Sequence, residues 1–332
     1  MPYFYSMNPF RINWLALLLL CQIAGRAQTA FTVVPLGVRG GLDESNLSSY
    51  MVAAAGAKEY ICLDAGTLYS GIRKAVANGA LPPPAATVLR SSIRAYFISH
   101  PHLDHVAGLI INSPDDSAKN IYGLAACLKV LEEKYFTWSS WANFGDEGEK
   151  PLLKKYHYVT MEPGRELVIE HTGLLVKAFP LSHGAPYEST AFLVRNGDDF
   201  LLYLGDTGAD SLEHSDKLHL LWEAVGPLAK AGRLKAIFIE VSFPSEQPDK
   251  SLFGHLTPRL LMQEMNNLVN IVGAPALKGL PVVITHRKPS GADPIRQPGG
   301  SDQEEVIRKE LVAGNPLGLK LVFPEQGKRL DL

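Results

Sequence analysis

Four side chains that can bind a metal ion lie within six positions of the stretch ISHPHLDHVAGL, residues 98–109: His100, His102, Asp104 and His105. Three imidazoles and a carboxylate are costly to desolvate together unless something compensates for the crowding. A divalent cation does so, because it stabilises deprotonated nitrogen and oxygen ligands at close range. This spacing predicts a metal site rather than a solvated loop that holds several histidines by coincidence.

Further candidate ligands follow apolar runs later in the chain. They are His183 after AFPLS, Asp206 after FLLYLG, His286 after PVVIT, and His255 within FGHLTP. Sites on α/β sheets gather at the carboxyl ends of strands. Four consecutive ligands cannot all satisfy one tetrahedral ion, so we expect some of these distant residues to complete the site.

The elements that must position these residues follow from the hydrophobic pattern. AYFIS, residues 95–99, reads as a strand, and alternation along an extended chain places His100 and His102 on one side. The chain then turns, and Asp104 and His105 open a short helix that approaches from the other side. Nine more runs read as strands: FTVVPLGV, EYICLDAG, ELVIEH, LLVKAFPL, TAFLVRN, FLLYLGD, AIFIEVS, PVVITH and LKLVFP.

Helical patterns are interspersed among these strands. The clearest is TPRLLMQEMNNLVNIVG, in which Leu261, Met265 and Leu268 form one apolar face. Thr257 is suited to the N-cap and Pro258 to the first helical position. With no repeat and no evident linker, the pattern predicts one α/β domain with mixed sheets.

Composition excludes several classes of protein. The chain has 332 residues, 46% of them hydrophobic and 20% charged, which is ordinary for a globular protein. Its net charge is −2. This weakly acidic balance argues against a nucleic-acid partner and fits a small ligand better.

The N-terminus has the layout of a cleaved secretory signal. A positive residue at Arg11 precedes an apolar run from Trp14 to Ile23, and small residues follow up to Ala27. The run is too short to span a bilayer of about 30 Å. We therefore expect a signal peptide over residues 1–27, a mature domain over 28–332, and a periplasmic or secreted protein with no membrane partner after cleavage.

Two other features have ordinary explanations. The glycines of LGVRGGLDES follow a strand but lack the spacing of a dinucleotide-binding loop, so a turn with unusual backbone angles is expected there. Cys62 and Cys127 are the cysteines of the mature chain; they could pair or remain buried thiols.

SHPHLDHVAGL resembles the H-x-H-x-D-H motif of the metallo-β-lactamase fold superfamily. Together with FLLYLGDTGAD, AIFIEVSFP, LFGHLTP and VVITHRKP it is similar to the class II cyclic-nucleotide phosphodiesterases, over residues 31–289. The resemblance implies a four-layered αβ/βα sandwich of the metallo-β-lactamase type. It also implies hydrolysis of 3′,5′-cyclic nucleotides, with cyclic AMP favoured, to 5′-nucleotides. One departure is Val241, where the family pattern has cysteine.

The resemblance further implies a dinuclear centre of divalent ions. The ligands are nitrogen and oxygen atoms, which suit zinc best, with manganese or iron possible. Asp64, in YICLDAG, would support the ligands from behind or cap the next turn. The first ion would be held by His100, His102 and His183, the second by Asp104, His105 and His286, and Asp206 would bridge the two.

The expected catalytic residues are His255, Glu240 and Asp104. His255 resembles a proton donor of related zinc phosphodiesterases, and Glu240 matches the carboxylate that orients it there. We expect this pairing to raise the pKa of His255 and keep the donor protonated. Replacement of His286 by His255 as a ligand is the alternative. Lys288 could contact the phosphate or be solvated.

Other readings remain open at this stage. A lactonase, thioesterase or β-lactamase on the same fold would not need the His255–Glu240 pair. A non-catalytic nucleotide-binding scavenger would not need a proton donor. The aromatic segment KYFTWSSWANF, residues 134–144, could stack on a purine through Phe136, Trp138 or Trp141, or pack as core or lid. The sequence predicts no particular oligomeric state.

Overall fold

The computed structural model describes residues 1–3, 29–289 and 302–332. The predicted signal peptide, residues 1–27, therefore lies almost wholly outside the described part of the chain. Among the helices that are described, none has both the length and the apolar character needed to cross a membrane.

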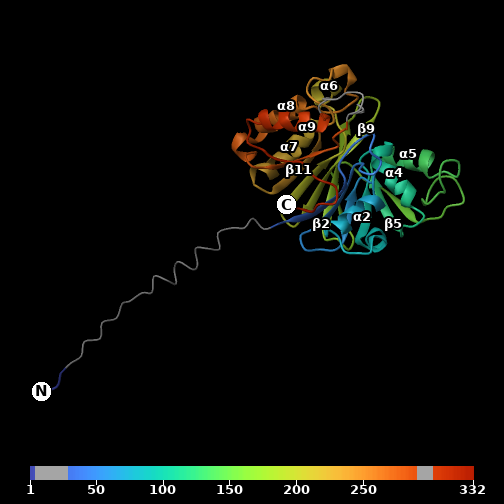
Figure 1. Ribbon diagram of the computed structural model, residues 1–332, viewed down its shortest axis with the longest axis horizontal. Helices are drawn as coiled ribbons and strands as arrows, with labels where there is room; N and C mark the ends of the chain where they lie inside the picture. Colours follow the sequence, from blue (N-terminus) through green and yellow to red (C-terminus); the bar gives the residue numbers. More distant parts are fainter. Residues whose placement is uncertain (4–28, 290–301) are drawn as a thin grey trace.

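Within the described residues, the strands form two seven-stranded mixed sheets that face each other (Figure 1). The order in the first sheet is β14-β1-β2-β3-β4-β5-β6, and in the second β13-β12-β11-β10-β9-β8-β7. The first sheet contains β1 (Phe31–Gly37), β2 (Ser49–Ala54), β3 (Tyr60–Leu63), β4 (Ile93–Phe97), β5 (Lys119–Gly123), β6 (Tyr156–Thr160) and β14 (Leu330–Asp331). The second contains β7 (Glu166–Ile169), β8 (Leu174–Ser182), β9 (Glu188–Asn196), β10 (Asp199–Leu204), β11 (Leu234–Glu240), β12 (Pro281–Thr285) and β13 (Lys320–Val322).

Helices cover the outer face of each sheet, which gives four layers. The helices of the first half are α2 (Tyr69–Ala77), α3 (Ala85–Thr87), α4 (Leu103–Asn112) and α5 (Ala125–Val130), with π-helical turns at Val88–Ser92 and Leu131–Tyr135. Those of the second half are α6 (Asp210–Glu213), α7 (Lys217–Lys230), α8 (Pro258–Val272) and α9 (Gln303–Ala313), with 3₁₀ turns at Asp249–Ser251 and Ala274–Ala276. The predicted αβ/βα sandwich is confirmed.

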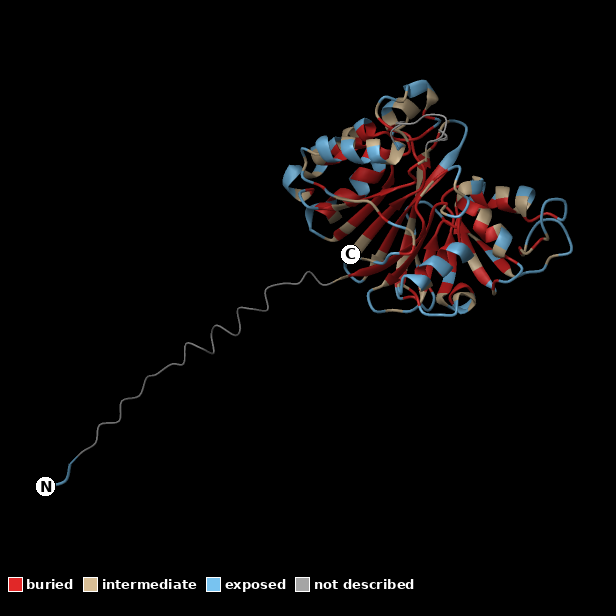
Figure 2. Cartoon of the chain, viewed as in Figure 1, coloured by how far each residue is buried: buried red, intermediate tan, exposed pale blue. Residues whose placement is uncertain are grey.

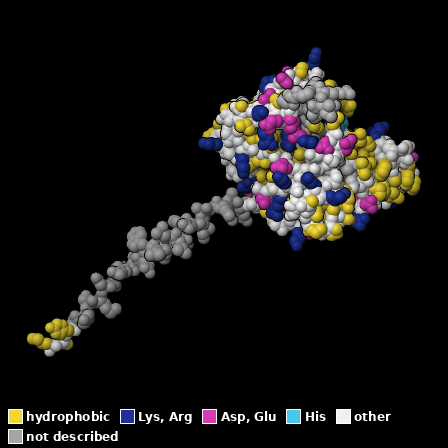
Figure 3. Space-filling view, viewed as in Figure 1, with side chains coloured by type: hydrophobic (Ala, Val, Ile, Leu, Met, Phe, Trp, Pro, Cys, Tyr) yellow, Lys and Arg dark blue, Asp and Glu magenta, His cyan; other side chains and the backbone are white. Residues whose placement is uncertain are grey.

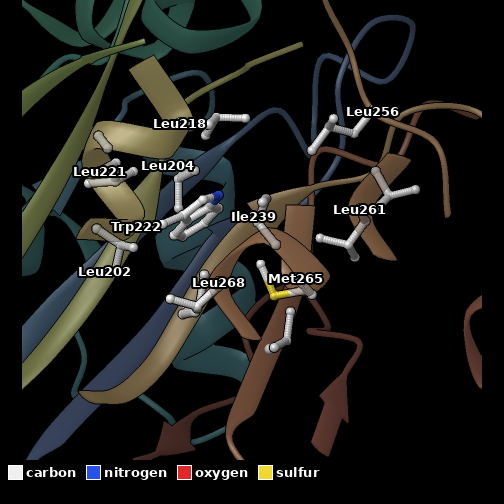
Figure 4. Packing of buried hydrophobic residues seen from close by; sticks show 14 of the residues in the cluster. Leu202, Leu204, Leu218, Leu221, Trp222, Ile239, Leu256, Leu261, Met265 and Leu268 are labelled. Atoms are coloured by element: carbon white, nitrogen blue, oxygen red, sulfur yellow. The ribbon is translucent and has the colours of Figure 1, made fainter. Parts of the chain in front are cut away.

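Three apolar clusters hold the layers together. One lies between the two sheets, with Phe97 and Phe192 at its centre. The second joins the first sheet to α2, α4 and α5, and the third joins the second sheet to α7, α8 and α9 around Trp222 (Figure 4). Burial is accordingly concentrated in the strands and the inner helix faces, while the outer helix faces are exposed (Figure 2).

Local predictions agree with the structure in most places. The ten predicted strands are all present, and Thr257 caps α8 by accepting a hydrogen bond from the Leu260 N–H at 3.3 Å. Cys62 and Cys127 are buried free thiols, so the pairing alternative is wrong. The segments that became β2, β5, β6 and β14 were not predicted, because they are short or rich in alanine and polar residues.

Positive and negative side chains are mixed over the central part of the face drawn in Figure 3. Lysine and arginine side chains alternate there with aspartate and glutamate among the described residues, without a continuous basic patch. This distribution agrees with the weakly acidic composition.

Candidate metal centre and active site

The ends of five strands bring the predicted site residues to one edge of the sandwich. His183 follows β8, Asp206 follows β10, and His286 follows β12. These strands point the same way, because β8 and β10 both run antiparallel to β9, and β10, β11 and β12 run parallel. Asp64 follows β3 and His100 follows β4 in the facing sheet. The carboxyl ends of both sheets therefore meet at this edge.

The first group of predicted ligands is assembled at the beginning of α4. The expected strand ends at Phe97, so His100 lies in a loop, and His102 is the extended N-cap of α4. The two side chains still face one another, with His100 Nε2 3.1 Å from His102 Nδ1. His183 joins them, its Nε2 3.3 Å from His102 Nδ1. Three ring nitrogens thus converge on one point.

The second group lies beside the first. His286 Nε2 is 3.1 Å from Asp104 Oδ2 and 3.1 Å from Asp206 Oδ2. His105 Nε2 is 3.3 Å from the same Asp206 oxygen. Asp206 also faces the first group, because its Oδ2 lies 3.8 Å from His100 Nε2. Its carboxylate therefore stands between the two groups.

Outward hydrogen bonds fix the orientation of four of these imidazoles. In each case Nδ1 contacts an oxygen behind the site, which places the proton on Nδ1 and leaves the Nε2 lone pair directed inward. The contacts are His100 Nδ1 to Ser99 Oγ at 3.0 Å, His105 Nδ1 to Asp64 Oδ2 at 2.7 Å, His183 Nδ1 to Gly254 O at 2.8 Å, and His286 Nδ1 to Ser242 Oγ at 2.9 Å.

Asp64 organises the back of the site, as the sequence suggested for it. Its carboxylate is buried and accepts hydrogen bonds from Ser99 N at 2.7 Å, Ser99 Oγ at 2.8 Å and Tyr203 Oη at 2.6 Å, in addition to His105. The same Ser99 hydroxyl contacts His100. One carboxylate therefore orients two histidines of the two neighbouring groups.

The donor set fits a divalent cation. Buried imidazole lone pairs point at one another and at carboxylate oxygens, and His105 Nε2 is a buried atom without a hydrogen-bond partner among the described residues. Such an arrangement is unfavourable unless a cation occupies the centre of the cluster. Together with the fold, these clusters indicate a divalent metal centre.

Electrostatics around Asp206 agree with this conclusion. Burial alone would raise the pKa of Asp206, but the charges of His286 and His105 outweigh it and hold the pKa well below its usual range. Burial lowers the pKa of His183 to about 4, against the opposing effect of Asp206. Burial and repulsion from His105 likewise hold the pKa of His100 well below its usual value. These shifts favour an ionised Asp206 with neutral His100 and His183, the protonation states that metal binding requires. His105 differs, because the charges of Asp206 and Asp64 outweigh burial and raise its pKa well above the ordinary value, so a cation bound there would displace a proton.

His255 and Glu240 form the expected pair, 2.7 Å apart between Nδ1 and Oε1. On its other side, His255 Nε2 lies 2.8 Å from Lys288 Nζ, so this lysine faces the site instead of solvent. Glu240 is the last residue of β11 and is buried; it also accepts hydrogen bonds from Ser242 Oγ at 2.7 Å and Thr207 N at 3.2 Å.

The expectation that Glu240 raises the pKa of His255 is wrong. Burial, helped by repulsion from Lys288, lowers the pKa of His255 to about 4 despite the attraction of Asp206. Burial, together with repulsion from Asp206, raises the pKa of Glu240 to about 7. Both groups therefore resist charge, because desolvation of the pair outweighs its mutual attraction.

The alternative role of His255 stays open on geometry. A ring nitrogen of His255 lies within 4.8 Å of candidate ligand atoms on His183 and Asp206, and also of those on Glu240 and His286. The His255 Nδ1 atom is 3.7 Å from Asp206 Oδ2, while the Nε2 atoms of His105 and His286 are closer to that oxygen, at 3.3 and 3.1 Å.

Sequence reasoning missed several residues that hold the site. Ser242 connects Glu240 to His286, and its only sequence signal is its place directly after the β11 strand. Gly40 packs on His286 so closely that a Cβ there would lie 2.1 Å from the ring. Gly41, at a φ of +77°, donates its N–H to Asp104 Oδ2 at 3.1 Å. The glycine loop is thus a turn with unusual backbone angles, as expected, and it also clamps two predicted ligands.

Phe136, Trp138 and Trp141 do not contribute to this cluster, although Tyr135 Oη of the same segment donates to Pro101 O, between His100 and His102, at 2.9 Å. Phe136 is fully buried in the core between the first sheet and its helices. Trp138 and Trp141 donate their Nε1 protons to Pro151 O at 2.9 Å and Ser113 Oγ at 3.1 Å, beyond the far end of α4. Of the two predicted roles for Phe136, stacking on a purine or packing in the core, the structure shows packing in the core.

Solved structures share this fold. The unliganded yeast PDE1 structure superposes with a TM-score of 0.78 and 23% identity, covering 92% of this chain and all of that chain. The metallo-β-lactamase fold protein YhfI from Bacillus subtilis superposes with a TM-score of 0.57 and 16% identity, covering 90% of this chain and 99% of the other.

Sequence comparison is more specific. A protein of Aliivibrio fischeri named 3′,5′-cyclic-nucleotide phosphodiesterase is 42% identical over 96% of this chain and 99% of its own length. The family described as cAMP phosphodiesterases class-II matches residues 29–327. Because the match spans nearly the whole chain and includes every strand end described above, the chain belongs to the family of class-II cAMP phosphodiesterases.

Proposed function

We propose that this protein hydrolyses 3′,5′-cyclic nucleotides, cyclic AMP preferentially, to 5′-nucleotides with the help of two divalent metal ions. Membership of the family supports the reaction. The observation that carries the proposal is the pair of adjacent ligand groups that share the Asp206 carboxylate.

The ligands would divide as the resemblance implies. His100, His102 and His183 would hold one ion. Asp104, His105 and His286 would hold the other, with Asp206 between them. Nitrogen and oxygen ligands in these proportions suit zinc, and manganese or iron are the competitors.

Bound cations would supply Lewis-acid chemistry, activating water and polarising a phosphoryl oxygen. The oxygen of water becomes bonded to phosphorus, and the bond from phosphorus to the 3′-oxygen breaks. His255, whose pKa of about 4 leaves it neutral before the reaction, would take up the proton that the attacking water loses and pass it to the leaving 3′-oxygen. Glu240 would orient His255 through Nδ1, and Lys288 would place a positive charge next to the reacting phosphate.

Two other functions fit the site less well. A lactonase, thioesterase or β-lactamase acts on a carbonyl carbon and has no need of a buried His255–Glu240 pair. A nucleotide scavenger needs neither this pair nor activated water. The contact between His255 and Glu240 favours the phosphodiesterase.

The direct test is turnover by metal-loaded protein after metal analysis. We expect 5′-AMP from cyclic AMP, with two equivalents of metal per chain and loss of turnover on chelation. Hydrolysis of a lactone or thioester without hydrolysis of cyclic AMP would reject the proposal in favour of the related hydrolases. Binding of cyclic AMP without 5′-AMP would identify a scavenger.

We also propose export with cleavage after Ala27. The apolar run in residues 14–23 and the small residues after it support this. N-terminal sequencing of the protein recovered from a bacterial host's periplasm should start at Gln28. Recovery of the uncleaved chain from the cytoplasm would contradict it.

A further inference from the structure

An apolar groove runs along α4, directly beside the second group of predicted ligands. It encloses a volume of about 710 Å³, which lies within the range of small-molecule sites. Its lining includes a stripe of α4 formed by Leu103, Ala107 and Ile111, together with Tyr69 at the start of α2.

Several large apolar side chains that line the groove are exposed to solvent. Leu103 is 61% exposed, Ile111 64% and Tyr69 40%. Leu103, Ala107 and Ile111 are four residues apart and therefore share one face of the helix. Isolated exposed apolar side chains are normal, but several around one groove mark a binding surface.

The groove is continuous with the metal centre. Asp104 lines its end, and the same carboxylate lies 3.1 Å from His286 Nε2. Gly41 also lines the groove and donates its N–H to Asp104 Oδ2. From Asp104 to Asn112 the helix extends about 12 Å, enough for a ribose and a purine placed end to end from a phosphate at the metal centre.

We propose that this groove binds the nucleobase of the substrate, with the base between the Tyr69 ring and the apolar face of α4. The inference rests on the proposed function, because it assumes a nucleotide phosphate at the metal centre. The groove walls are largely apolar, and a planar base is the part of a cyclic nucleotide that such walls can desolvate.

A competing place for the base lies on the other side of the cluster. Tyr187 is 58% exposed, and its ring centroid is 5.0 Å from that of His102. It does not line the α4 groove. Replacement of Tyr187 therefore serves as the comparison in the experiment on the α4 groove.

The experiment compares equilibrium binding of 5′-AMP and ribose 5-phosphate to metal-loaded protein. Wild type should bind 5′-AMP at least about tenfold more tightly, since stacking and burial of a base contribute that much. Ala107→Trp, which fills the groove, and Tyr69→Ala, which removes one wall, should each reduce this preference severalfold or more. Leu220→Trp on α7, a control at an exposed apolar position outside the groove, should keep it.

Several results would overturn the inference. Equal affinity of wild type for the two ligands, retention of the preference in both groove variants, or its loss in Tyr187→Ala alone would each do so. A change of oligomeric state in Ala107→Trp with the preference intact would show that the groove is an interface between copies. Failure of the proposed function is distinguishable: cyclic AMP would not be hydrolysed, yet the preference for 5′-AMP and its loss in the groove variants would persist.

Discussion

At the scale of single residues, Asp206 lies between the two groups of predicted ligands. Its Oδ2 lies within 3.9 Å of a nitrogen on each of His100, His105, His183 and His286. No other carboxylate oxygen among the described residues makes contacts with both groups of predicted ligands. This geometry supports the bridging role proposed for Asp206.

Asp206→Ala should therefore lose metal and activity together. We expect metal content to fall below one equivalent and turnover of cyclic AMP to fall by more than about 100-fold, the upper range for partners outside the ligand set. Metal analysis beside steady-state kinetics measures both. Asp198→Asn, at a carboxylate 82% exposed, is the matched control and should resemble wild type. Full metal content with near-normal turnover in Asp206→Ala would rule out the bridge.

Replacement of His255 distinguishes a role in proton transfer from a role in metal binding. His255→Ala should keep both metal equivalents while kcat falls by about 10²–10⁴-fold, the usual contribution of a general acid. His219→Ala, at an exposed histidine on α7, serves as control. Loss of one metal equivalent from His255→Ala would instead make this residue a ligand, the alternative that the geometry leaves open.

At the scale of elements, close backbone packing positions the ligands. The loop after β3 lies directly on α4: Ala65 N donates to His105 O at 2.8 Å, and Gly108 N donates to Gly66 O at 2.9 Å. A Cβ on Gly66 would lie 2.0 Å from Asp104 O, so glycine is required there. The Gly40–Gly41 loop presses on His286 and Asp104 from the other side. These elements hold the second group of predicted ligands in a rigid frame.

Gly40→Ala tests this frame. The new methyl would meet the His286 ring, so we expect a loss of about 1–3 kcal/mol in unfolding free energy together with weaker binding of the second metal. Gly71→Ala is the control, because its methyl would clash with Leu36 O at 2.2 Å, within the core and away from the ligands. Chemical denaturation and metal titration should show destabilisation in both variants but weakened metal binding only in Gly40→Ala. Equal metal affinity in the two variants would contradict the claim that the Gly40–Gly41 loop positions the second group of predicted ligands.

At the scale of the whole molecule, the two sheets meet around a cluster in which several histidines are hard to protonate, whereas the charges of Asp206 and Asp64 outweigh burial and raise the pKa of His105. Burial lowers the pKa values of His183 and His255 to about 4, while those of histidines in an unfolded chain lie near 6.5. Between these values the unfolded chain binds protons that the folded chain does not, so stability rises with pH. Glu240, with a pKa raised to about 7, acts in the opposite direction, but it is one group against several histidines.

The metal-free protein should therefore lose stability as the pH falls from about 6.5 to about 4. Thermal unfolding at several pH values in the presence of a chelator measures this. The slope should be smaller in His183→Gln, which removes one of the responsible groups, and unchanged in His219→Gln, an exposed histidine. Stability that is constant or increases on acidification would contradict the predicted sign.

The sequence by itself determined the kinds of elements and the kinds of chemistry. Apolar runs of five to eight residues predicted ten of the strands, and the closely spaced His100, His102, Asp104 and His105 predicted a bound cation. Such signals are local, because hydrophobic periodicity and ligand crowding are properties of neighbouring residues. The resemblance to a family then supplied the distant partners His183, Asp206 and His286.

Only the tertiary structure decided what depends on contacts between distant segments. β5 and β6 gain their place from parallel neighbours rather than from their own composition, and Ser242, Gly40 and Gly41 become part of the site only because β11, β12 and the loop after β1 meet at one edge. The pKa of His255 fell where the sequence predicted a rise, because burial is a property of the whole fold and outweighs the attraction of one carboxylate partner. The groove along α4 has the same origin, since Tyr69 and Ile111 come to line one groove only after the helices have packed on the sheet.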